Sequence, residues 1–211
     1  MKAADSRALG FSSPDDGEEL ARAEVYGLLA ALFYAPPDAA LYEQLQVAVT
    51  EAPARGGLLE RSWGELVAAS RRLSLAELQD EYAALFLGVG KPDVFLYGSY
   101  YLVGTLNDKP LVELRRDLQA LGLERPETVS ETEDHIASLC EVMRYLIAGD
   151  DVAVSNLAMQ QRFYNEHLRG WVESFCDTLA AHSGADFYAA LAGFARDFFA
   201  VEAQGLDMLD T

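Results

Sequence analysis

The ionisable side chains most suited to chemistry lie together in the middle of the chain, at Glu131, Glu133, Asp134 and His135. Apolar residues recur at helical spacing from Ile136 onward, which predicts an amphipathic helix. Ser130 followed three residues later by Glu133 is a capping-box pattern, so we expect this helix to begin at Glu131. Acidic residues in a first turn complement the helix dipole, and this structural explanation stays open for Glu131 and Glu133.

Asp134 and His135 are the pair for which function is the stronger interpretation. On a helix that begins at Glu131, Asp134 points away from the apolar stripe and His135 lies at its edge. Adjacent helical residues diverge by about 100°, so these two cannot hydrogen-bond each other as a catalytic base and its orienting acid would. General acid–base chemistry, as in a small hydrolase or a nucleotide-binding protein, is therefore the alternative to ligand binding.

Several site classes are excluded by the short supply of ligands and motifs. The chain has three histidines and lacks the paired Glu-x-x-His motifs of a ferritin-like metal site. It also lacks His-Glu-x-x-His and phosphate-binding glycine motifs, and Gly88 to Lys91 has no following Ser or Thr. Of the two cysteines, Cys140 lies on an apolar stripe and reads as a reduced core residue. We expect neither a metal nor a cofactor.

The acidic composition restricts the partners that the chain can bind. A formal net charge of −18 over 211 residues disfavours nucleic acid and anionic lipid and favours cationic partners, although it also serves solubility. The N-terminal residues show no secretory signal pattern. The longest uncharged run, residues 94–107, is too short to span a bilayer. We expect a cytoplasmic protein without a membrane segment.

Hydrophobic spacing predicts helices throughout and no sheet. The expected helices cover residues 18–34, a segment opened by Pro37, a segment around Trp63, residues 75–86, 110–121 and 131–147, two segments within 152–181, and residues 185–203. The glycine- and tyrosine-rich stretch 89–106 has no helical period and reads as a loop with one helical turn. The expected fold is all-α, with eight or nine helices.

The helices are expected to form two lobes around a hinge. We divide the chain into a flexible tail at 1–17, an N-terminal lobe at 18–122, a hinge at 123–130 and a C-terminal lobe at 131–211. The hinge would permit a domain-swapped dimer as an alternative to a monomer. A groove between lobes, with carboxylates and tyrosines, suits an extended peptide with arginines and apolar residues.

A set of short motifs resembles the TorD/DmsD family of redox-enzyme maturation chaperones. The motifs are Tyr82-Ala83-Ala84-Leu85-Phe86 before Gly88, Tyr97-Gly98-Ser99-Tyr100-Tyr101, Leu121-Gly122-Leu123 before a linker, Asp134-His135-Ile136-Ala137, and the aromatic residues Trp171, Phe175, Phe187 and Tyr188. The resemblance covers residues 20–208, and the Asp-His pair after an acidic segment is its most specific part. Thr132 stands where the family usually has a proline.

The resemblance implies a cytoplasmic, all-helical chaperone without enzymatic activity. Such a chaperone binds the twin-arginine leader and the apo-form of a molybdenum-cofactor oxidoreductase, and holds the apoprotein until the cofactor is inserted. For Tyr82, Leu85 and Phe86 core packing stays open beside ligand contact, and Ser99 could equally cap a short helix. The leader-binding residues implied by the resemblance are Glu131, Glu133, Asp134, His135, Tyr82, Leu85, Phe86, Tyr97, Ser99 and Tyr100.

Overall fold

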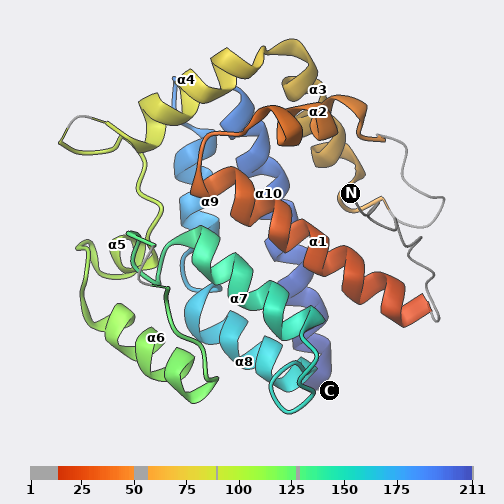
Figure 1. Ribbon diagram of the computed structural model, residues 1–211, viewed down its shortest axis with the longest axis vertical. Helices are drawn as coiled ribbons and strands as arrows, with labels where there is room; N and C mark the ends of the chain where they lie inside the picture. The colour runs from red at the N-terminus through yellow and green to blue at the C-terminus, as the bar shows by residue number, and fades with distance from the viewer. Residues whose placement is uncertain (1–13, 50–56, 89, 127–128, 211) are drawn as a thin grey trace, which may run out of the picture.

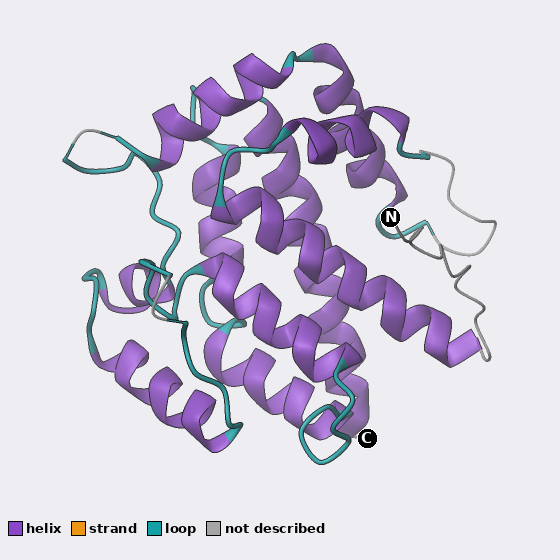
Figure 2. Ribbon diagram, viewed as in Figure 1, coloured by secondary structure: helices purple, strands orange, loops and turns teal. Residues whose placement is uncertain are grey.

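The computed structural model describes residues 14–49, 57–88, 90–126 and 129–210. The expected tail up to residue 13, the break before residue 57 and the middle of the expected hinge, 127–128, lie outside these ranges. Within them the chain is helical, without a named strand, as expected (Figure 2). The helices are α1 (Pro14–Tyr34), α2 (Ala39–Val47), α3 (Glu60–Arg72), α4 (Leu75–Phe86), α5 (Gly98–Val103), α6 (Lys109–Ala120), α7 (Ile136–Ala148), α8 (Leu157–His167), α9 (Val172–Ala180) and α10 (Phe187–Asp207).

Local capping signals set most helix starts. Ser74 and Glu77 form the predicted capping box of α4, in which each side chain accepts a hydrogen bond from the other's backbone N–H. Asp108 caps α6, with Pro110 in its first turn. The helical turn expected within 89–106 is α5. Helix α1 begins at Pro14, so residues 14–17 of the expected tail are helical.

The helices enclose one continuous core. Helix α1 lies along α7, and the long helix α10 runs behind them against α3, α8 and α9 (Figure 1). Buried apolar residues from both expected lobes belong to one cluster, which includes Leu29 of α1, Met143 of α7 and Phe198 of α10. Cys140 is buried and not in a disulfide, as expected for a reduced core residue, and the same holds for Cys176. The division into two lobes stays a prediction.

Helix α10 begins at a cap supplied by another helix. Its own N-cap residue, Asp186, makes no side-chain capping hydrogen bond. Instead, the carboxylate of Glu81 in α4 accepts hydrogen bonds from the backbone N–H groups of residues 186–188, at 2.7, 3.1 and 2.8 Å. These N–H groups have no partners within the helix, so Glu81 satisfies them and fastens α4 to α10.

No helix in the described part of the chain combines the length and the apolar character needed to cross a bilayer.

Candidate functional site

Two irregular segments of the predicted site cross each other beside α7. Tyr97, before α5, and His135, before α7, form an antiparallel bridge. The N–H of Ile136 donates to the carbonyl oxygen of Leu96 (2.8 Å), and the N–H of Gly98 donates to that of Asp134 (2.9 Å). A side chain at Gly98 would meet the Trp171 ring at 3.0 Å, so the backbone approaches this ring closely only because residue 98 is glycine. The crossing fixes the start of α7 against α5.

Asp134 caps α5 across this crossing. Its Oδ2 accepts hydrogen bonds from the backbone N–H and the hydroxyl of Ser99, at 3.0 and 2.5 Å. Its side chain is directed into the protein, and the residue is only 3% exposed. A carboxylate at a helix N-terminus satisfies otherwise unpaired N–H groups and complements the helix dipole. The predicted orientation of Asp134, away from the apolar core, is therefore wrong.

Thr132, which stands where the family usually has a proline, makes two hydrogen bonds in the turn before α7. Its hydroxyl donates to Oδ1 of Asp134 (2.6 Å), and its carbonyl oxygen accepts a hydrogen bond from the N–H of His135 (3.1 Å). A proline would restrict this turn by its ring. Of the two hydrogen bonds here, only the first depends on threonine, because it needs a hydroxyl donor; the second uses the backbone carbonyl that every residue has.

His135 is the N-cap residue of α7, and its Nδ1 accepts a hydrogen bond from the N–H of Ala137 (3.1 Å). The helix thus begins at Ile136, and the capping box predicted from Ser130 and Glu133 is wrong. His135 is 2% exposed, not at the edge of the core as predicted. Burial lowers its pKa to about 4, although the carboxylates of Glu131 and Asp134 act in the opposite direction. At neutral pH the imidazole is therefore uncharged.

The two glutamates have partners within the chain. The hydroxyl of Tyr97 and that of Ser130 both donate to Glu131. Glu133 forms ion pairs with Arg115 of α6 (2.8 Å) and Arg125 (3.4 Å). Burial acts to raise the pKa of Glu133, but the hydrogen bond from Arg115 and the two guanidinium charges outweigh it and lower the pKa. Both carboxylates are thus shielded by neighbours that the sequence pattern did not reveal.

The structure gathers half of the predicted site residues into one cluster. Five of them meet at the crossing: Tyr97, Ser99, Glu131, Asp134 and His135. Tyr100 lies beside it and stacks on Phe95 with ring centroids 4.0 Å apart. The three from α4 are buried in the core: Tyr82, Leu85 and Phe86. Tyr82 donates its hydroxyl to the carbonyl oxygen of Phe33 (3.2 Å), which fits the core-packing interpretation.

An apolar groove of about 530 Å³ runs beside this cluster, between α1, α7 and the segment that follows α6. Among the predicted site residues, Glu133 alone lines it. Its charged residues are Glu124, Arg125, Glu133 and Glu141. The other lining residues are Ala30, Ala31, Tyr34, Leu118, Leu123, Pro126, Val129, Ala137, Ser138, Val142 and Tyr145. A second hollow shares Glu141 and Tyr145 and extends the groove toward Gly149.

None of the sequence motifs pointed to this groove, although the sequence carries a signal of it. Val142 and Tyr145 on α7, and Ala31 and Tyr34 on α1, are spaced three apart on the flank of each helix's buried stripe. Tyr34 and Tyr145 remain 47% and 37% exposed. Large exposed aromatic side chains on neighbouring helices mark a surface able to receive an apolar ligand.

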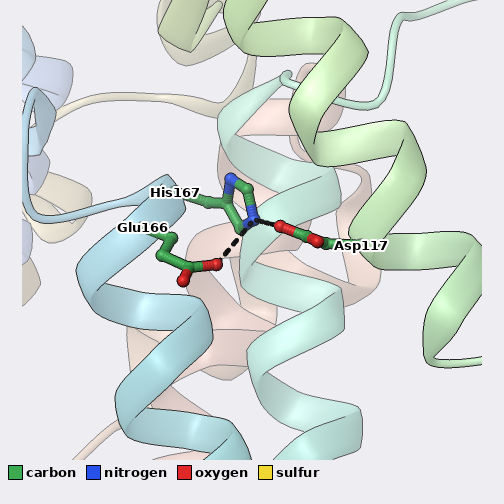
Figure 3. Close-up of side chains that lie close together, drawn as sticks. All are labelled: Asp117, Glu166 and His167. Atoms are coloured by element: carbon green, nitrogen blue, oxygen red, sulfur yellow. Dashed lines mark hydrogen bonds and ion pairs between the residues drawn. The ribbon is translucent and has the colours of Figure 1, made fainter.

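A second group of ionisable side chains joins α6 to α8 (Figure 3). Nε2 of His167 lies 3.0 Å from Asp117 and 3.9 Å from Glu166. These residue types suit a divalent cation. However, the guanidinium of Arg162 also pairs with both carboxylates, at 3.6 and 3.3 Å, and offsets part of their charge. We therefore assign the group as an ion-pair network between two helices, and we continue to expect no metal.

Comparison with known proteins identifies the family. The model of the nitrate reductase delta subunit family matches residues 53–177, more than half of the chain. The chain belongs to this family, which includes the TorD chaperones. It is 29% identical to the chaperone protein TorD of Vibrio cholerae serotype O1, over 89% of this chain and 93% of that protein. TorD of Photobacterium profundum is 28% identical over 54% of this chain and 56% of that protein.

The fold agrees with that assignment. A solved structure described as that of a redox enzyme maturation protein from Archaeoglobus fulgidus matches with a TM-score of 0.58, over 92% of this chain and 99% of that one. At 18% identity this likeness concerns the fold alone. The expected TorD-family membership and all-α fold are confirmed. The relatives are named chaperones, which supports a maturation chaperone and not the alternative of a hydrolase.

Proposed function

We propose that this TorD-family protein is a cytoplasmic chaperone for the catalytic subunit of a molybdenum-cofactor oxidoreductase. It binds the twin-arginine leader and the apoprotein, and holds them until the cofactor is inserted and the enzyme is exported. One observation carries the proposal: a long apolar groove bears a partly buried carboxylate, Glu133, on its wall.

The groove has the chemistry that a twin-arginine leader requires. Such a leader combines two arginines with an apolar stretch. The apolar stretch would be buried against Ala31, Val142 and Tyr145. A leader guanidinium would pair with Glu133, and the second with Glu141 or Glu124 at the rim.

The buried members of the predicted site serve this proposal as positioning residues. Asp134 and His135 hold the crossing from which Glu133 projects into the groove. The network from Glu131 to Tyr97 holds the same segment from its other side. Tyr82, Leu85 and Phe86 are buried in the core and do not line the groove. In this arrangement the Asp-His pair is required for leader binding without contacting the leader.

The test is a calorimetric titration with a leader peptide that carries two arginines and with the same peptide carrying two glutamines. Charge-assisted hydrogen bonds contribute about 1.5–3 kcal/mol, so we expect the arginine peptide to bind at least about tenfold more tightly. Equal affinity for the two peptides would contradict the proposal.

A pair of matched variants locates the contact. Glu133→Gln should weaken binding of the arginine peptide by roughly fivefold or more, because it removes the buried partner of a guanidinium. Glu113→Gln is the control, since Glu113 is an exposed glutamate of α6 that does not line the groove. Equal weakening by both variants would indicate a general effect of net charge and no site at Glu133.

A further inference from the structure

Glu133 already holds two guanidinium groups of its own chain. Arg115 contacts Oε2 through Nη2 at 2.8 Å and through Nε at 2.9 Å. Arg125 approaches the other oxygen, Oε1, at 3.4 Å through Nε. Each oxygen of the carboxylate is thus assigned to a different arginine. Under the proposed function, one leader guanidinium would take this same carboxylate.

The exposure of the three side chains indicates which of them can leave. The side chain of Glu133 is 14% exposed, whereas those of Arg115 and Arg125 are 49% and 35% exposed. Ion pairs with an exposed partner are weak, because water solvates the partner after it separates. Glu133 must stay and keep a cationic partner, while either arginine can turn into solvent at little cost.

Arg125 also connects Glu133 to one wall of the groove. It follows Glu124 and precedes Pro126, and all three line the groove. Its guanidinium also donates a hydrogen bond to the carbonyl oxygen of Val129, a further lining residue. The ion pair with Glu133 therefore draws this segment toward the start of α7. Release of Arg125 would free the segment.

We propose that Arg115 and Arg125 are internal competitors for the leader arginines at Glu133. In the free chaperone they occupy the carboxylate and hold the 123–126 segment against the groove. A leader arginine displaces them, so that one guanidinium replaces another and the buried carboxylate is never left unpaired. The inference rests on the proposed function and adds to it how the carboxylate of Glu133 stays paired when no leader is bound.

Removal of the competitors should strengthen leader binding. We expect Arg125→Ala and Arg115→Ala each to tighten binding of the two-arginine peptide by about two- to fivefold, the range of a partly exposed ion pair. Binding of the two-glutamine peptide should not change. Arg116→Ala is the matched control, because it removes the same charge from the next position of α6, which is exposed and makes no ion pair with Glu133.

The results separate the two proposals. If wild type prefers the arginine peptide but Arg115→Ala and Arg125→Ala bind it no more tightly than Arg116→Ala does, the competition is refuted and the proposed function stands. If wild type shows no preference, both proposals fail. Circular dichroism checks that each variant is folded, and Arg125→Gln, which keeps the length of the side chain, replaces Arg125→Ala if that variant unfolds.

Discussion

At the scale of the residue, the Asp-His pair is a support and not an open receptor. The carboxylate of Asp134 accepts hydrogen bonds from Ser99 and Thr132, and Nδ1 of His135 accepts one from the first turn of α7. The two side chains do not hydrogen-bond each other, which removes the geometry of a base and its orienting acid. The residue with access to a ligand is their neighbour, Glu133.

The lowered pKa of His135 predicts a loss of stability in mild acid. The unfolded state binds a proton near the ordinary pKa of 6.5, whereas the folded state binds it only near pH 4. Between these values the unfolded state holds more protons, so the free energy of unfolding falls as the pH falls and is fully retained above pH 6.5. Urea titrations of wild type and His135→Asn from pH 7 to pH 4 measure this contribution.

Asparagine at position 135 keeps a capping acceptor but does not titrate. From pH 7 to pH 4 the free energy of unfolding of wild type should fall by roughly 2–3 kcal/mol more than that of His135→Asn. Contributions from other groups, such as His167, are common to both proteins and cancel in this comparison. Parallel pH profiles would show that protonation of His135 does not limit stability.

At the scale of the element, two helices depend on caps from distant segments. Asp134 caps α5 over 35 residues of sequence, and Glu81 caps α10 over 105 to 107 residues. Such a cap does two tasks at once, since it satisfies the helix N-terminus and fixes the angle between two elements. Part of the acidic excess of this chain therefore serves the architecture.

Glu81→Ala should destabilise the docking of α10 on α4. Three backbone N–H groups lose their carboxylate partner, and we expect the free energy of unfolding to fall by about 1–3 kcal/mol. Asp80→Ala is the control, because Asp80 is the exposed preceding residue and supplies no cap. Urea denaturation followed by circular dichroism measures both variants. Similar midpoints for the two would refute the capping role of Glu81.

At the scale of the whole molecule, one buried ion pair ties the first helix to the last. Glu202 of α10 accepts hydrogen bonds from Arg22 of α1 at 2.7 and 2.9 Å and from Tyr26 at 3.1 Å. Gln160 of α8 also accepts a hydrogen bond from Arg22 (3.1 Å). The side chain of Glu202 is 3% exposed. If the carboxylate of such a buried ion pair is removed, the charge of its guanidinium partner is left uncompensated.

Glu202→Gln should therefore lower the free energy of unfolding by about 2–4 kcal/mol. The unfolding transition should stay cooperative, because the pair lies in the continuous core. Asp177→Asn breaks the exposed ion pair with Arg196 and should cost less than about 1 kcal/mol. Differential scanning calorimetry compares the two. If Asp177→Asn lowered the free energy of unfolding more than Glu202→Gln does, the buried ion pair would not be the more important of the two.

The sequence by itself determined the helices, their apolar faces and the local cap of α4, because each depends on residues within one or two turns. The family motifs also follow from the sequence, since they are short. The tertiary structure alone decided which partners Glu81, Glu133, Asp134 and Glu202 take. Ser130 and Glu133 match a local capping box, yet Glu133 pairs with Arg115 and Arg125, and the helix begins at Ile136 with His135 as its N-cap residue. A buried carboxylate must find its donors wherever the fold brings them, and here these lie up to 180 residues away.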